Sequence, residues 1–241
     1  MEKNNIEYLK KYGNPDTFES DLKRLENGEP VQYIIGNVEF YGYTFKVTKD
    51  TLIPRFETEE LVNRTIKYID KFFDTKELNI VDLGTGTGCI GITLKKELPN
   101  SCVTLVDISD EAIKVAEDNK KDNNVDVKIV KSNFFANLND KYHVVISNPP
   151  YLTESDDIMD IVLKNEPHLA LFADNDGYKC YEDILKDIKE HLIIPGIIAF
   201  EMGFTQGEKI KSMIKKIYPN AIVSIEKDLQ EKDRFIFAFI K

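Results

Sequence analysis

Asn148, Pro149, Pro150 and Tyr151 are consecutive, and their side-chain types could hold a reacting group in place. Two adjacent prolines remove two backbone donors and fix two φ angles, so this segment should form a rigid loop. The Asn148 side-chain oxygen and the Pro149 carbonyl oxygen can accept the two N–H groups of a planar NH₂, while Tyr151 stacks on its face. Holding reactants in line is worth about 7–11 kcal/mol, so positioning can supply most of the catalysis. We therefore expect these four residues to be catalytic and to bind a planar amide or aromatic amine.

A glycine-rich segment, Gly84-Thr85-Gly86-Thr87-Gly88, follows an apolar run that predicts the first strand of a sheet. Glycines at alternate positions let the backbone approach a ligand closely. The next strand ends at Asp107, whose carboxylate can accept hydrogen bonds from both hydroxyls of a ribose. Cys89 stands where the dinucleotide-binding pattern GxGxxG has its third glycine, which favours a nucleoside with an amino-acid tail over a pyrophosphate. Asp82, within the first strand, either reaches this ligand or anchors the loop, and the sequence leaves both interpretations open.

S-adenosylmethionine is a nucleoside of this kind, and it carries a methyl group on a sulfonium. The predicted chemistry is therefore methyl transfer to nitrogen. The lone pair of a planar amide or aromatic amine is delocalised, so the rigid loop must orient that lone pair toward the methyl carbon.

The elements that must position these residues begin near residue 78, where short apolar runs alternate with helical stretches. The five expected parallel strands cover residues 78–83, 102–108, 125–130, 143–146 and 196–200. The expected helices between and after them cover residues 89–98, 110–119 with Ser109 as N-cap, 181–192 and 206–217. Runs at 221–226 and 234–240 leave no room for a helix between them and should form an antiparallel terminal hairpin. This pattern predicts an α/β fold with a doubly wound, mostly parallel sheet, which binds ligands at the carboxyl ends of its strands.

The chain upstream of this sheet divides into two smaller parts. Residues 1–30 have spaced apolar positions interrupted by Gly13 and Pro15, which predicts a short helical N-terminal region. Residues 31–52 form an expected linker, with a β-hairpin over 31–47 because aromatic and β-branched residues dominate there. Residues 53–241 would then be the methyltransferase domain, beginning with a helix over 57–73.

Composition excludes several classes of protein. Lys and Arg number 32 against 42 Asp and Glu, so the net charge is −10, which disfavours direct binding of nucleic acid. The longest uncharged apolar stretch, residues 192–200, contains Pro195 and is too short for a membrane span. The start of the chain does not resemble a signal peptide, so we expect a cytoplasmic protein without membrane contact.

The cysteines and histidines do not predict a metal site. Cys89, Cys102 and Cys180 form no CxxC pair, and we expect three reduced thiols with packing roles. The three histidines occur in no metal-ligand spacing, so structural roles are favoured for them. We therefore expect no bound metal.

The glycine-rich loop, the strand-end Asp107 and the segment 148–151 together resemble the amino-methyltransferases that depend on S-adenosylmethionine. Five further segments match one branch of them: PVQYIIG at 30–36, FYG at 40–42, IPRFETEEL at 53–61, EPHLAL at 166–171 and EMG at 201–203. Over residues 30–237 the chain resembles the HemK/PrmC type of protein-(glutamine-N5) methyltransferase.

This resemblance implies both the fold and the substrate. The fold would be the class I methyltransferase type with seven strands, and the product of the cofactor would be S-adenosyl-L-homocysteine. The substrate would be the glutamine of the GGQ motif in class 1 peptide chain release factors, which links the protein to translation termination. By this resemblance Gly84 to Gly88, Asp107, Phe134 and Asn148 contact the cofactor, and Asn148 to Tyr151 hold the glutamine. The Phe134 ring would lie over adenine.

The chain departs from the family pattern at a few positions. Phe56 stands where proline is common, and we expect it to reshape the entry of the following helix slightly. Asn133 replaces a usual aspartate, and its amide oxygen can still accept a hydrogen bond from the adenine amino group. Ile197 replaces a glycine. The helical N-terminal region is shorter than in the family, which bears on the affinity for the release factor.

Two alternative functions remain open at this point. An adenine-N6 methyltransferase of DNA or RNA would use a similar loop, but the sequence shows neither a basic stripe nor a separate target-recognition region. A cofactor-binding interaction protein without catalysis would not require Asn148 and Tyr151 together.

We expect a monomeric enzyme.

Overall fold

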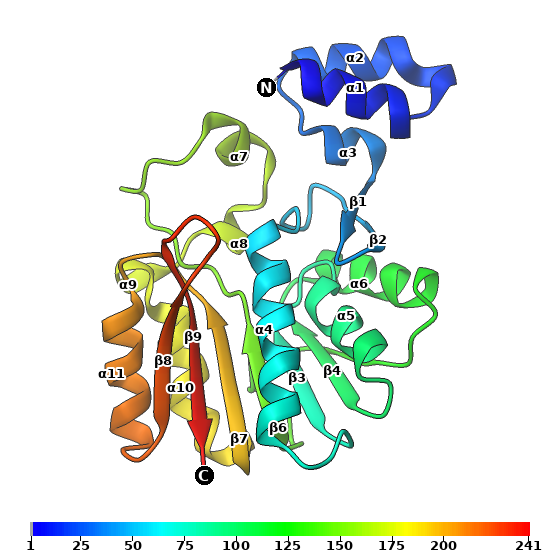
Figure 1. Ribbon diagram of the computed structural model, residues 1–241. Helices are drawn as coiled ribbons and strands as arrows, with labels where there is room; N and C mark the ends of the chain where they lie inside the picture. Colours follow the sequence, from blue (N-terminus) through cyan, green and yellow to red (C-terminus); the bar gives the residue numbers. More distant parts are fainter. Residues whose placement is uncertain (1) are drawn as a thin grey trace.

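The computed structural model describes residues 2–241, and a seven-stranded sheet forms its centre (Figure 1). The strands lie in the order β5-β4-β3-β6-β7-β9-β8. Their bounds are β3 Asn79–Leu83, β4 Cys102–Asp107, β5 Lys128–Lys131, β6 Tyr142–Ser147, β7 Leu192–Glu201, β8 Ile222–Lys227 and β9 Asp233–Ile240. Strands β3 to β7 are parallel, and β9 pairs antiparallel with both β7 and β8. The predicted doubly wound sheet with its terminal antiparallel hairpin is confirmed.

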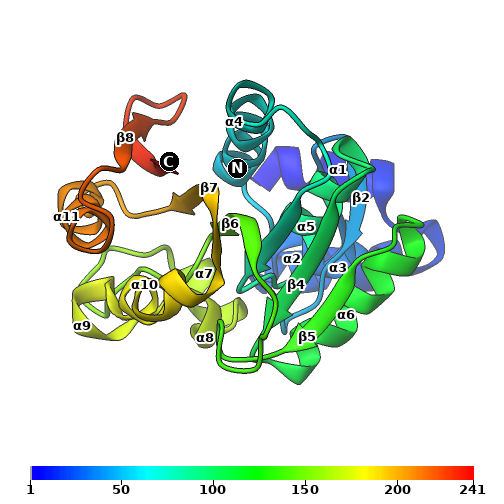
Figure 2. The ribbon, with the colours of Figure 1, turned by 90° about the horizontal axis from the view of Figure 1, so that it is seen from below.

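Helices cover both faces of this sheet because alternate strand residues point to opposite sides (Figure 2). The first face carries α4 (Phe56–Phe72), α5 (Cys89–Glu97) and α6 (Asp110–Asp122), and the second carries α10 (Lys179–His191) and α11 (Gly207–Ile217). Ile80 of β3 packs in the first core, whereas Val81 and Leu83 pack in the second. The predicted long helices are confirmed with ends shifted by a few residues, and the Ser109 hydroxyl caps α6 by accepting from the Ala112 N–H.

The N-terminal part lies beyond one end of the sheet (Figure 1). It consists of α1 (Glu2–Tyr12), the 3₁₀ turn η1 (Pro15–Thr17), α2 (Phe18–Glu26), α3 (Val31–Ile35) and the antiparallel pair β1 (Asn37–Phe40) and β2 (Tyr43–Lys46). The division of the chain after residues 30 and 52 stays a prediction.

The hairpin expected over 31–47 was wrong for its first residues, which form α3. Val31 and Ile34 are three positions apart, and helical geometry places both against Leu9 of α1 in a small separate core. Gly36 ends the helix in the left-handed conformation, with φ of 83°. Burial of the two side chains therefore overrides the β-propensity of this segment.

Three short helices between β6 and α10 were not predicted. They are α7 (Asp160–Asn165), α8 (His168–Leu171) and α9 (Asp174–Gly177), and the last contains two residues with left-handed backbone angles, Asn175 and Asp176. Each is too short to show a helical repeat of apolar residues, so tertiary contacts rather than periodicity define them. Among residues 2–241, no helix is long and apolar enough to cross a bilayer.

Candidate active site

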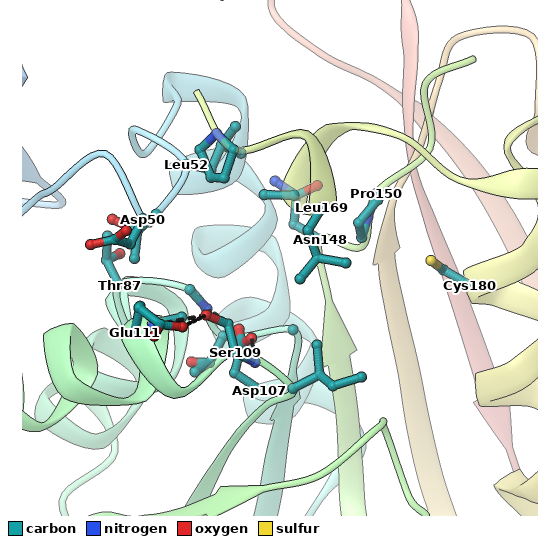
Figure 3. Close-up of a pocket in the computed structure, with 18 of the residues that line it drawn as sticks. Asp50, Leu52, Thr87, Asp107, Ser109, Glu111, Asn148, Pro150, Leu169 and Cys180 are labelled. Carbon is teal, nitrogen blue, oxygen red and sulfur yellow. Dashed lines mark hydrogen bonds between the residues drawn. The ribbon is translucent and has the colours of Figure 1, made fainter. Parts of the chain in front are cut away.

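Two cavities meet at the carboxyl ends of the central strands. The larger, of about 410 Å³, lies over the ends of β3 and β4, and the smaller, of about 280 Å³, lies beyond β6. Leu52, Asn148, Pro150 and Ala170 line both cavities. Figure 3 shows Asn148 and Pro150 across the larger cavity from Asp107 and Ser109. The rigid loop at residues 148–151, which directly follows β6 and is called the corner below, thus lies between two cavities of ligand size.

The structure distributes the predicted site residues between these cavities. Those that line the larger cavity are Gly84, Thr85, Gly86, Thr87, Asp107, Phe134, Asn148 and Pro150. Those that line the smaller cavity are Asn148, Pro149, Pro150 and Tyr151. Gly88 is not among the lining residues of either cavity. Its place is beneath the loop, where an added Cβ would lie 2.9 Å from Ile92 of α5.

The glycine-rich loop presents bare backbone to the larger cavity. Gly84 and Gly86 have φ of +71° and +54°, and a Cβ added at either position would point into open space. The Asp107 Oδ2 atom accepts from the Gly86 N–H at 2.8 Å, and its Oδ1 atom accepts from the Ser109 N–H at 3.0 Å. Burial raises the pKa of Asp107, while these N–H groups act in the opposite direction. Asp107 therefore fixes the loop, and each carboxylate oxygen keeps a second lone pair for a ligand.

The sequence leaves open whether Asp82 reaches the ligand or anchors the glycine-rich loop, and in the structure its side chain anchors the loop. Its side chain is fully buried, and Oδ2 accepts from the Thr85 hydroxyl at 2.5 Å and from the Gly91 N–H at 3.0 Å. Burial raises the pKa of Asp82 to about 7, and the two hydrogen bonds oppose that increase. Asp82 is not a lining residue of the larger cavity.

The Asn148 side chain is held from two other elements. Its Nδ2 atom donates to the Thr58 hydroxyl in the first turn of α4 at 3.1 Å. That hydroxyl donates in turn to Glu201 Oε2, at the last residue of β7, at 2.8 Å. Thr58 and Glu201 are 3% and 2% exposed, so water does not compete for these bonds.

Both the backbone and the side chain of Tyr151 are held by contacts from the other side of the corner. The Gln206 Nε2 atom donates to the Tyr151 carbonyl oxygen at 3.2 Å, and Arg234 donates to the Tyr151 hydroxyl at 3.4 Å. Gly177 lies so close that a Cβ added to it would be 2.2 Å from the Tyr151 carbonyl oxygen. The corner is therefore supported on both sides.

Replacing Gly177 by alanine should lower the free energy of unfolding by about 2–4 kcal/mol, because it combines left-handed strain with a backbone clash. Its φ is +79°. Gly28 is a matched control, since its φ is +86° and an added Cβ there meets no atom within 4 Å. We expect Gly28→Ala to cost only about 1–2 kcal/mol, the strain alone. Urea unfolding followed by circular dichroism measures both, and equal losses would contradict the contact with Tyr151.

Glu201 should make the stability depend on pH. Burial raises its pKa from 4.5 to about 7, while the bond from Thr58 and the charge of Arg234 act in the opposite direction. Between pH 4.5 and 7 the native state keeps a proton that the unfolded state has released. The free energy of unfolding should therefore fall as pH rises through this window, by up to about 1.4 kcal/mol per unit for this group.

The measurement is urea unfolding at pH 5, 6 and 7. Glu201→Gln should flatten the decline relative to the unmodified protein, because the variant lacks the titrating carboxyl group. Glu190→Gln, at an exposed position near the end of α10, should leave the slope unchanged. An unaltered slope in Glu201→Gln would show that the carboxyl group does not titrate in this range.

One wall of the smaller cavity is held by an ion pair. Glu166 is 4% exposed, and its Oε1 atom lies 2.5 Å from the Arg55 guanidinium. The Glu166 Oε2 atom accepts from the Ile53 N–H at 3.3 Å. These contacts tie the segment before α4, which lines the smaller cavity at Leu52 and Arg55, to the segment before α8, the helix that lines it at Ala170 and Leu171.

Sequence reasoning missed several residues of this site. Thr58 had no assigned role, although it lies in the segment 53–61 that carries the family resemblance, and that match was the available signal. The sequence predicts a packing role for Cys180, but this residue also lines the larger cavity (Figure 3). No feature of the sequence indicates this, because helix α10 reaches the cavity only through the tertiary fold.

The larger cavity fits a nucleoside with an amino-acid tail. Its volume lies in the range of small-molecule sites, about 300–1,000 Å³. Bare backbone at Gly84 and Gly86 leaves room for close approach, and Asp107 offers carboxylate oxygens. Phe134, whose backbone φ is 47°, adds an aromatic ring to the lining. Within residues 2–241, no group of three or more His, Cys, Asp or Glu side chains is arranged to hold a metal ion.

Solved methyltransferases share this fold. A methyltransferase from Pyrococcus furiosus superposes with a TM-score of 0.58 at 18% identity, covering 91% of this chain and 98% of the other. A ribosomal protein L11 methylase from Lactobacillus delbrueckii gives 0.54 at 20% identity, covering 78% of this chain and 79% of the other. These similarities confirm the class I methyltransferase fold.

Sequence comparison identifies the family. The family called Methyltransferase small domain matches residues 58–171. A release factor glutamine methyltransferase of Bacillus anthracis is 37% identical, covering 93% of this chain and 81% of the relative. One of Enterococcus faecalis is 39% identical, covering 92% of this chain and 80% of the relative. The chain therefore belongs to the release factor glutamine methyltransferase family, as the sequence resemblance predicted.

Proposed function

We propose that the protein transfers a methyl group from S-adenosylmethionine to the side-chain amide nitrogen, N5, of a glutamine. The substrate is the glutamine of the GGQ motif in class 1 peptide chain release factors. The observation that carries this proposal is the place of Asn148 and Pro150 on the boundary between two cavities. A cofactor in one cavity and a carboxamide in the other would meet at these residues. Family membership supports the identity of the substrate.

The residues of the larger cavity would hold the cofactor. The backbone of Gly84 to Thr87 would contact its amino-acid tail, and Asp107 would accept hydrogen bonds from the ribose hydroxyls. The Phe134 ring would lie over adenine, and Asn133 would accept from the adenine amino group. S-adenosylmethionine supplies, when bound, an electrophilic methyl group on a positively charged sulfur.

The residues of the smaller cavity would orient the glutamine. The Asn148 Oδ1 atom and the Pro149 carbonyl oxygen would accept its two N–H groups, and Tyr151 would stack on the carboxamide plane. This arrangement directs the nitrogen lone pair toward the larger cavity and restrains rotation of the amide. Positioning is the main contribution, and the proton released from nitrogen passes to water.

Other features of the chain favour a protein substrate over a nucleic acid. The net charge of −10 opposes binding to polyanions such as DNA and RNA. Separately, the arrangement described above needs no metal ion. We place the reaction in the cytoplasm, where release factors act.

Transfer of radioactive methyl from labelled S-adenosylmethionine tests the proposal. The purified protein is incubated with a class 1 release factor, with the same factor carrying Gln→Ala in GGQ, and with adenine-containing DNA. Label should appear on the first substrate alone. Label on DNA, or undiminished label on the altered factor, would overturn the assignment.

A further inference from the structure

Three side chains from distant parts of the sequence form one series of hydrogen bonds beside the corner, where Thr58 lines the larger cavity and Glu201 lines the smaller one. Asn148 follows β6, Thr58 lies in the first turn of α4, and Glu201 is the last residue of β7. The bond from Asn148 Nδ2 to Thr58 Oγ1 is 3.1 Å, and the bond from Thr58 Oγ1 to Glu201 Oε2 is 2.8 Å. Only the fold brings these groups together.

The protons available to these three side chains decide which group donates in each of the two hydrogen bonds. A threonine hydroxyl has a single proton, and when the Glu201 carboxyl group is ionised, above its raised pKa of about 7, that proton goes to Glu201 Oε2. The Thr58 oxygen can then only accept a hydrogen bond from Asn148. The NH₂ end of the Asn148 carboxamide must therefore face Thr58, which turns the Oδ1 end away from it.

The orientation of this carboxamide decides what Asn148 can do. With Oδ1 turned away from Thr58, the side chain can accept an N–H group from a visiting carboxamide. A rotation of about 180° at the side-chain amide would present NH₂ instead, and two NH₂ groups cannot bond to each other. The approaching group would then lose its acceptor.

We propose that Thr58 is a positioning residue, whose hydroxyl, held by Glu201, fixes the Asn148 carboxamide with Oδ1 toward the substrate amide. This inference rests on the proposed function, because it assigns a purpose to the Asn148 oxygen. Thr58 acts through Asn148 and need not touch the transferred group.

The hydroxyl of a second threonine in the same helix bonds within the helix, whereas the Thr58 hydroxyl bonds to other elements. Thr65 is fully buried in α4, and its hydroxyl donates to the Leu61 carbonyl oxygen one turn earlier. That bond stays within the helix. The Thr58 hydroxyl instead bonds to β7 and to the corner, so it links three elements.

This contrast supplies a matched control for the experiment. Thr58→Val and Thr65→Val remove the same hydroxyl from buried positions of the same helix. Thr58→Ser restores the hydroxyl at the first position. We expect Thr58→Val to lower kcat for release factor methylation by about 10- to 30-fold, equivalent to about 1.4–2 kcal/mol. Thr58 lines the larger cavity but is only 3% exposed, and it is not among the residues assigned to either substrate. The KM values for both substrates should therefore change less than about threefold.

The controls separate positioning from structural damage. Thr58→Ser should keep kcat within about threefold of the unmodified protein, and Thr65→Val should keep it within about twofold. An undiminished kcat in Thr58→Val would overturn the inference. So would an equal loss in Thr65→Val, because the effect would then reflect loosening of α4.

A spectroscopic measurement keeps this inference separate from the proposed function. The side-chain NH₂ signals of Asn148, assigned in ¹⁵N-labelled protein by their absence in Asn148→Ala, should exchange slowly with solvent. Thr58→Val should accelerate this exchange at least tenfold, whereas Thr65→Val should not. If the unmodified protein methylates no release factor, the proposed function fails, and the exchange rates alone decide the orientation of Asn148. Unchanged exchange in Thr58→Val would overturn the role of Thr58.

Discussion

Replacing Asn148 by alanine should lower kcat for glutamine methylation by about 100- to 1,000-fold, the loss typical when a preorganised hydrogen-bonding group is removed from an active site. The variant loses the side-chain oxygen that would accept an N–H group of the glutamine, so the amide can rotate out of line. It keeps the glycine-rich loop and Asp107, so the dissociation constant for S-adenosylmethionine should rise by less than about tenfold. Single-turnover methylation and calorimetric titration measure the two quantities.

Asn139→Ala is the control for this substitution. Asn139 is exposed and is not a lining residue of either cavity, so its kcat should match that of the unmodified protein. A kcat in Asn148→Ala within threefold of the unmodified value would remove the role assigned to the side-chain oxygen. A loss confined to cofactor binding would assign Asn148 to the larger cavity alone.

Replacing Asp107 by alanine should raise the dissociation constant for the cofactor by about 10- to 100-fold, because hydrogen bonds to a charged group are worth about 1.5–3 kcal/mol. The substitution removes the expected partner of the ribose hydroxyls. It also removes the acceptor for the Gly86 and Ser109 N–H groups, so the loop should loosen. Calorimetric titration with S-adenosylhomocysteine measures the affinity without turnover.

A ligand that lacks one ribose hydroxyl separates these two effects. The unmodified protein should bind 2′-deoxy S-adenosylhomocysteine more weakly than the parent compound, whereas Asp107→Ala should bind both equally. If the variant still prefers the parent compound to the same extent, the carboxylate does not contact that hydroxyl. Asp126→Ala, at an exposed position before β5, should leave both affinities unchanged.

The strands and long helices could be predicted because their signals are local. The run before Gly84 is apolar and short, and the stretch after Ser109 has both a capping residue and a helical repeat. The segment 31–35 was misassigned because its β-branched and aromatic residues favour a strand. The packing of Val31 and Ile34 against Leu9 decides its conformation, and propensity alone does not include that contact.

The candidate site was predicted where its residues are contiguous in sequence. Asn148 to Tyr151 form a rigid corner from the chemistry of proline alone, and the glycine-rich loop is recognisable from its spacing. The role of Asp82 stayed open, because a buried strand aspartate can point to the ligand or to the loop. The bonds from Thr85 and Gly91 settle its direction, and those partners become neighbours only after the strand, loop and helix have folded.

The sequence by itself determined the class of fold, the corner at 148–151, the loop at 84–88 and the family, because each depends on neighbouring residues or on a matched pattern. Only the tertiary structure placed Thr58 and Glu201 beside Asn148, and Gly177 against Tyr151. It also placed Asn148 and Pro150 between the two cavities. The physical reason is that hydrogen bonds and steric contacts act over a few ångströms. Residues far apart in the chain acquire them only when the sheet brings the ends of β6 and β7 beside the start of α4.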